Sequence, residues 1–99
     1  MEVNTLRNSR KAETLLQKLR QVESARRVLK ALPITASCGE WRAAVSSLHR
    51  SEYDALTLAK KRGIIVTGYI KRMLAQPELS DVRLLQEIMA EMAANNKED

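Results

Sequence analysis

The chain has 99 residues, of which 44% are hydrophobic and 29% charged, and its formal net charge is +5. This apolar content is too high for an intrinsically disordered protein, and a chain of this length normally forms one domain. Because only three glycines and two prolines interrupt many good helix formers, we expect one mainly helical domain over residues 1–99.

The cellular setting is indicated by what the sequence lacks. The single cysteine, Cys38, cannot form an internal disulfide, and no cysteine and histidine cluster has the spacing of a metal site. No apolar run approaches the roughly 20 residues needed to cross a bilayer, and the N-terminus lacks the pattern of a cleaved signal peptide. We therefore expect a cytoplasmic protein without a membrane partner or a bound metal.

The first predicted element is a long amphipathic helix over residues 5–32, where apolar residues recur every three or four positions. At 1.5 Å per residue it measures about 40 Å, which exceeds the width of so small a domain. Its apolar seam includes Leu15, Leu19 and Val22. We expect part of this helix to kink, to protrude or to pair with a second copy, and we predict a homodimer.

The second predicted helix covers residues 38–62. Ser37 and Glu40 have the spacing of a capping box at its start, and Gly63 tolerates the left-handed conformation used beyond a helix end. Seven apolar residues are predicted to face inward: Trp41, Ala44, Val45, Leu48, Ala55, Leu58 and Ala59. Because residues 49–52 interrupt this stripe, an alternative is a short strand near residues 41–47, followed by a turn and a shorter helix.

Two shorter helices are predicted to follow, over residues 67–75 and 80–93, with Thr67 and Ser80 as their N-terminal caps. Residues 94–99 are expected to fray. The last helix carries an apolar face that includes Leu85, Met89 and Met92. Methionine adapts to irregular surfaces, so this face and the seam of the first helix are the predicted partner-binding residues: Leu15, Leu19, Val22, Leu85, Met89 and Met92. Filling of the core is the alternative interpretation of the methionine face.

Charge is unevenly distributed along the chain. Residues 1–76 contain 15 basic and 6 acidic side chains, whereas residues 77–99 contain 2 basic and 6 acidic ones. Several of the basic residues surround the Gly63 turn. Clustered cations attract the phosphate backbone of nucleic acids, and a solvated helical surface is the alternative interpretation.

The segment 52–76, EYDALTLAKKRGIIVTGYIKRMLAQ, resembles the helix, glycine turn and helix of ribbon-helix-helix DNA-binding proteins. The resemblance implies a dimer in which a strand over residues 41–47 enters the major groove, with Arg42 contacting guanine. It also implies that Thr67 and Lys71 approach a phosphate. The predicted nucleic-acid contacts are Arg42, Lys60, Lys61, Arg62, Thr67, Lys71 and Arg72.

Catalysis finds little support in the sequence. His49 is the only histidine and has no predictable partner, and no glycine-rich phosphate loop or nucleophile elbow is present. We therefore predict a protein that is not an enzyme, with no cofactor and no small-molecule substrate. The predicted function is that of a dimeric DNA-binding regulatory or accessory protein. The alternative is a helical protein-interaction module, such as an adaptor, an inhibitor of a larger complex or a secretion chaperone.

Overall fold

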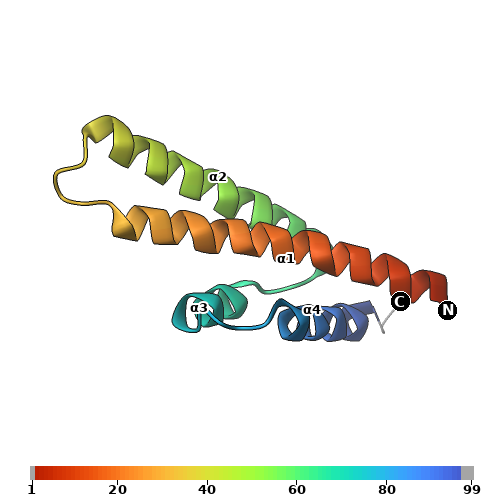
Figure 1. Cartoon of the computed structure of the whole chain (residues 1–99). Coiled ribbons are helices and arrows are strands. Elements are labelled where there is room, and N and C mark those ends of the chain that lie inside the picture. The colour runs from red at the N-terminus through yellow and green to blue at the C-terminus, as the bar shows by residue number, and fades with distance from the viewer. Residues whose placement is uncertain (1, 97–99) are drawn as a thin grey trace.

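The computed structural model describes the backbone of residues 2–96 and the side chains of residues 9–95. Within this range the protein consists of four helices and no strand (Figure 1). The helices are α1 (Glu2–Ala31), α2 (Cys38–Arg62), α3 (Thr67–Ala75) and α4 (Asp81–Asn96). The mainly helical class is confirmed, and α2 and α3 have the predicted bounds.

The two terminal helices are longer than the apolar patterns predicted. Helix α1 begins at Glu2 and ends one residue early, at Ala31, while α4 begins at Asp81 and runs to Asn96. Of the expected frayed tail, residues 94–96 continue α4, and residues 97–99 lie outside the described range.

The start of α2 contradicts the alternative with a strand near residues 41–47. The hydroxyl of Ser37 accepts a hydrogen bond from the Glu40 N–H at 3.1 Å, which satisfies one of the free amides at the helix start. This cap fixes the first turn, and Ala44 is then buried at helical spacing from Ala55 and Ala59. Residues 41–47, including Arg42, are therefore helical, and the ribbon that the family resemblance implies is absent from the described residues.

The turn after α2 is the predicted glycine turn. Gly63 has φ 71° and ψ 30°, and its N–H donates to the carbonyl of Lys60 at 3.2 Å. The N–H of Ile64 donates to the carbonyl of Ala59 at 2.9 Å, so the two bonds form a Schellman motif. The predicted cap by Thr67 is wrong, because Val66 holds the cap position and no side chain caps α3.

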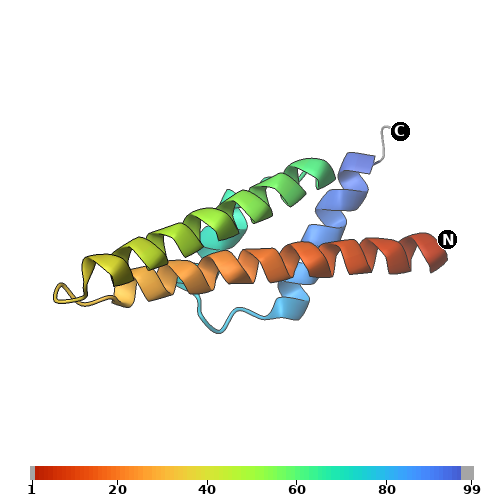
Figure 2. The ribbon, with the colours of Figure 1, turned by 90° about the horizontal axis from the view of Figure 1, so that it is seen from above.

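Helix α1 is the common support of the other three helices. Helix α2 runs antiparallel to it on one side, and α3 and α4 lie on the other side, where α4 crosses α1 (Figures 1 and 2). The other helices approach one another closely at few points. The core therefore forms around the apolar seam of α1, and its largest fully buried side chains are Leu15, Leu19, Val22, Met73, Leu84 and Ile88.

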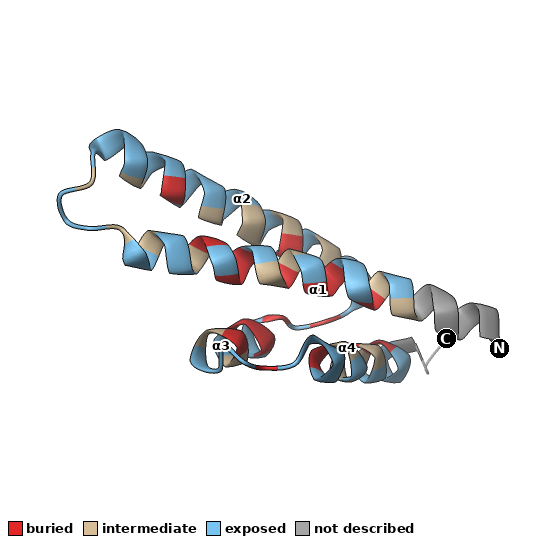
Figure 3. Ribbon diagram, in the orientation of Figure 1, coloured by how far each residue is buried: buried red, intermediate tan, exposed pale blue. Residues whose placement is uncertain are grey.

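The molecule is elongated because the hairpin of α1 and α2 extends past α3. Its principal extents are 54 × 25 × 19 Å and its radius of gyration is 15.5 Å, compared with about 13 Å for a compact domain of 100 residues. No residue from 26 to 43 is buried, whereas the middle of α1 is buried on one side (Figure 3). The end of the hairpin thus protrudes, as the length of the first predicted helix indicates.

Candidate functional site

The predicted nucleic-acid contacts do not form one continuous site. Lys60 and Lys61 are exposed in the last turn of α2, and Thr67 and Lys71 are exposed on α3, so these four residues surround the Gly63 turn. Arg42 is also exposed but precedes Lys60 by 18 residues in α2, a distance of about 27 Å along the helix axis.

The remaining two arginines of that set face the protein itself. Arg72 forms a bidentate ion pair with Glu87 of α4, with N–O distances of 2.5 and 2.8 Å. The hydrogen bonds from Arg72 lower the pKa of the Glu87 carboxyl. Arg62 is half-buried, and its Nε has no hydrogen-bond partner within the described residues. Arg72 therefore joins α3 to α4, and its guanidinium is already occupied.

The predicted partner-binding residues lie in or against the core of the single chain. Leu15, Leu19 and Val22 are fully buried, and Met92 of α4 is 2% exposed. Leu85 and Met89 are half-buried against the same cluster. The seam that was expected to join two copies is thus covered by helices of the same chain.

A groove between α2 and α3 is a surface that the sequence did not identify as a site. It consists of two adjoining pockets that share Arg26 of α1 and Glu52 of α2. We call this surface the α2–α3 groove. The pocket nearer the tip of the hairpin, the distal pocket, has a volume of about 430 Å³ and is lined by Arg26, Arg27, Leu29, Lys30, Leu48, Glu52 and Leu74.

The second pocket, the proximal pocket, lies nearer the Gly63 turn. Its volume is about 310 Å³, and it is lined by Arg26, Glu52, Ala55, Leu56, Val66, Thr67, Ile70 and Lys71. Leu56 is 56% exposed, although a side chain of this size is normally buried in a protein core. Thr67 and Lys71, two of the predicted nucleic-acid contacts, belong to this apolar pocket.

The groove carries more cations than carboxylates. Arg26, Arg27, Lys30 and Lys71 line it, and Glu52 is the one acidic residue among its lining side chains. Arg26 forms an ion pair with Glu52 at 2.9 Å. Within the described residues, neither Lys30 nor Lys71 takes part in an ion pair. An apolar groove with a positive rim is complementary to an apolar segment that carries negative charge.

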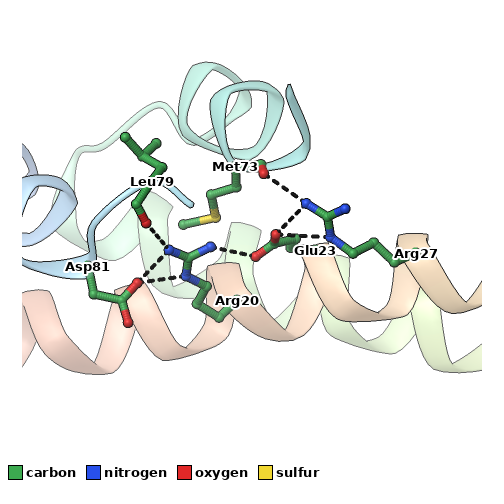
Figure 4. A network of polar contacts seen from close by, with 6 residues as sticks. All are labelled: Arg20, Glu23, Arg27, Met73, Leu79 and Asp81. Atoms are coloured by element: carbon green, nitrogen blue, oxygen red, sulfur yellow. Dashed lines mark hydrogen bonds and ion pairs between the residues drawn. The ribbon is translucent and has the colours of Figure 1, made fainter. Parts of the chain in front are cut away.

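A polar cluster holds the wall formed by α3 in place (Figure 4). The Arg27 guanidinium donates to the carbonyl of Met73, the seventh residue of α3, at 3.0 Å. The Arg20 guanidinium donates to the carbonyl of Leu79 at 2.8 Å and contacts Asp81 at the start of α4. Both arginines bind Glu23, which is only 8% exposed.

The charge of Glu23 is favoured within this cluster. Burial alone raises the pKa of its carboxyl, but hydrogen bonds from Arg20 and Arg27 outweigh burial and hold the pKa below its ordinary value. The cluster therefore remains ionised at neutral pH, and it fixes the position of α3 relative to α1.

One signal in the sequence of α2 could have indicated the groove. Trp41, Val45, Leu48 and Leu56 follow one helical stripe, beside the stripe formed by Ala44, Ala55 and Ala59. Only the alanine stripe is buried against α1; Trp41 and Leu48 are half-buried, and Val45 is 36% exposed. This apolar arc is too broad for one neighbouring helix to cover. Part of its surface is therefore left open.

Neither a metal site nor a helix able to cross a membrane is found among the described residues. Within the described residues, no group of three or more histidine, cysteine or acidic side chains could hold a metal ion. None of the helices over this range combines the length and the apolar character that crossing a membrane requires. Comparison with known proteins gives no match to a family model, to a curated protein or to a solved structure. The resemblance of residues 52–76 to ribbon-helix-helix proteins therefore stays a prediction.

Proposed function

We propose that the protein is a non-enzymatic interaction module that binds an acidic amphipathic helix of a partner protein in the α2–α3 groove. The observation that carries the proposal is the groove itself, in which the exposed Leu56 and the half-buried Leu48 and Leu74 lie beside cations. Amphipathic helices bind other proteins by placing their apolar face in such grooves.

The dimensions and charge of the groove support a helix as the occupant. Its walls are two helices, and a third helix packs between such walls at the usual spacing of 8–10 Å between axes. Leu48 and Leu56 place the two pockets a little more than two turns apart along α2. An acidic occupant is favoured because Lys30 and Lys71 of the lining take part in no ion pair within the described residues, whereas Arg26 is paired with Glu52 and Arg27 with Glu23.

A selection from a display library of amphipathic helices tests this function. We expect the protein to enrich clones with an apolar face and acidic flanking residues. Leu56→Lys is expected to abolish binding of the selected helices, because it places a charge in the proximal pocket. Val82→Lys is the matched control, since Val82 is 65% exposed on α4 and lies outside the groove.

The outcomes of this selection are distinct. Failure to enrich any helix, or equal binding by the Leu56→Lys and Val82→Lys variants, contradicts the proposal. If the protein is instead a dimer that Leu56→Lys converts to a folded monomer, the groove is occupied by a second copy of the chain. Circular dichroism of each variant establishes that it remains folded.

The second candidate function is binding to duplex DNA, and the basic residues around the Gly63 turn favour it. Lys60, Lys61 and Lys71 are exposed there and take part in no ion pair within the described residues. Such cations bind phosphates without reading sequence. This candidate requires no strand, because contacts of this kind involve the DNA backbone alone.

Duplex binding at two salt concentrations tests the second candidate. We expect affinity to fall with salt, and we expect Lys60→Ala with Lys61→Ala to reduce the slope of log affinity against log salt by about 2. Arg83→Ala, which removes an exposed cation of α4, is the control. Affinity that is indifferent to salt, or absent at low salt, excludes DNA as the partner.

A further inference from the structure

The ion pair between Arg26 and Glu52 divides the α2–α3 groove into its two pockets. Arg26 projects from α1 and Glu52 from α2, and both side chains line the distal and the proximal pocket. An occupant that fills both pockets must therefore pass over this ion pair, and the residue that it places there determines whether the contact is favourable.

The Arg26 guanidinium has hydrogen-bond donors to offer to such a residue. A guanidinium carries five N–H donors, and among the described residues the one hydrogen bond of Arg26 is that from its terminal nitrogen to Glu52 at 2.9 Å. The Arg26 side chain is 40% exposed. Its open side faces the groove, and Lys71 of α3 lines the same proximal pocket from the opposite wall.

The balance of charge at this point favours an anion. Arg26 and Lys71 contribute two positive charges, and Glu52 contributes one negative charge, so the middle of the groove is net positive. A carboxylate there gains a charge-assisted hydrogen bond, whereas an ammonium group is repelled by two cations. A neutral amide gains a weaker hydrogen bond and lies between these two cases.

The spacing of the pockets fixes where this carboxylate lies in the occupant. Leu48 of the distal pocket and Leu56 of the proximal pocket are eight residues apart in α2, or about 12 Å along its axis. Two side chains of a neighbouring helix reach both pockets when they are seven or eight residues apart. A residue midway between them faces Arg26, because positions three or four apart share one helix face.

We infer that the partner helix carries two large apolar residues seven or eight positions apart, with Asp or Glu midway between them that binds Arg26. This inference rests on the function proposed above. It specifies the recognised motif, and it makes Arg26 a specificity-determining residue, with Lys71 supporting the same charge preference.

Three synthetic helices test the motif. Each is a lactam-stapled peptide of 15 residues with two leucines seven positions apart, and the residue midway is Glu, Gln or Lys. By fluorescence anisotropy we expect the Glu peptide to bind roughly tenfold more tightly than the Lys peptide, with the Gln peptide between them. A fourth peptide, in which one leucine is moved by two positions, is expected to bind weakly, because that side chain turns away from its pocket.

A variant that keeps the net charge of the groove distinguishes direct contact with Arg26 from the overall electrostatic attraction of the protein. Arg26→Gln combined with Glu52→Gln removes one charge of each sign, so the net charge of the groove is unchanged. We expect this variant to bind all three peptides but to lose most of the preference for Glu over Gln. Arg83→Gln, on α4 and outside the groove, is expected to retain the preference.

The outcomes distinguish the recognised motif from the more general proposal that the groove binds a helix. Peptides that bind the groove without regard to the middle residue, or with the same preference in the variant that keeps the net charge, overturn the motif but leave the interaction module intact. Equal binding of the peptide with the displaced leucine also overturns the motif. If no peptide binds and Leu56→Lys changes nothing in the library selection, the proposed function fails as well.

Discussion

Glu23 is a charged residue whose contribution to stability depends on pH. Its carboxylate accepts hydrogen bonds from Arg20 and Arg27, and these lower its pKa in the folded state despite burial. A lowered folded pKa means that the ionised group stabilises the fold above its unfolded pKa. This stabilisation is lost as the pH falls through the folded pKa. The cluster should therefore weaken on acidification, and α3 should be released from α1 first.

Glu23→Gln is expected to lower the free energy of unfolding by about 1–3 kcal/mol at pH 7, because two arginines lose an ionic partner. At pH 3 the difference between the variant and the wild type should be smaller, since stabilisation by a carboxyl with a lowered folded pKa is lost as the pH falls through that pKa. Urea unfolding at both pH values measures this. Glu13→Gln, at an exposed position of α1, is the control and should change stability little at either pH. An equal loss at pH 7 and pH 3 would falsify the ionic role of Glu23.

Substitutions at two glycines are expected to change the stability of the protein in opposite directions. Gly63 has a positive φ, and a Cβ added there would lie 3.2 Å from the side-chain nitrogen Nδ2 of Asn95. Gly68 is helical, and a Cβ added there would meet nothing within 4 Å. We expect Gly63→Ala to destabilise the protein by about 1–2 kcal/mol and Gly68→Ala to stabilise it by roughly 0.5 kcal/mol. Thermal unfolding of the two variants checks both signs, and a Gly63→Ala variant as stable as the wild type contradicts the left-handed turn.

At the scale of the elements, the two halves of α2 differ in how they are buried. Its first half has one buried residue, Ala44, whereas its second half contributes Ala55 and Ala59 to the main core. Backbone amides with few buried neighbours open at lower free energy. We expect the amides of residues 42–50 to exchange with solvent faster than those of residues 55–62, as followed by hydrogen exchange and mass spectrometry. Binding of a helix in the distal pocket should slow exchange in the first half, and uniform protection along α2 would contradict this difference.

The limits of α2 follow from signals that act over a few residues, and the sequence predicted them. The bounds of α3 were also predicted, although Thr67 does not cap it as expected. Ser37 caps the start of α2, and Gly63 ends it with a left-handed residue. The groove between these helices depends instead on contacts between distant residues. The hydrogen bonds from Arg20 to Leu79 and from Arg27 to Met73 join positions 59 and 46 apart in the chain, and both accept at backbone carbonyls. A carbonyl is common to every residue, so such a bond leaves no pattern in the sequence.

The basic residues predicted to cluster around Gly63 have different roles in the structure. The sequence could not predict these roles, because they too depend on contacts between distant residues. The sequence shows that Lys71 and Arg72 are basic, but it does not show that Glu87 forms an ion pair with Arg72 and not with Lys71. The partner of each cation depends on how α4 is placed. Lys71 therefore remains at the groove, while its neighbour in the chain holds two helices together.

At the scale of the whole molecule, the apolar seam of α1 forms the core of a single chain. Leu19 is fully buried, in contact with the main core. We expect Leu19→Asp to unfold the protein, because an unpaired charge is then placed in an apolar interior. Light scattering and circular dichroism together measure mass and helix content. A folded monomer obtained from a wild-type dimer would instead show that this seam joins two copies. The predicted homodimer, if it forms with this fold, must use another surface.

The order of the four described helices has a consequence for synthesis in the cell. The three later helices pack on α1, which is synthesised before them. At about 5–20 residues per second, α4 is complete roughly 3–13 s after α1. During this interval the seam around Leu15, Leu19 and Val22 is covered by α2 at most, and the surface for α3 and α4 stays open to nascent-chain chaperones. A slower codon run between α2 and α3 should prolong that exposure, and α4, the last helix to be made, completes the enclosure of the seam.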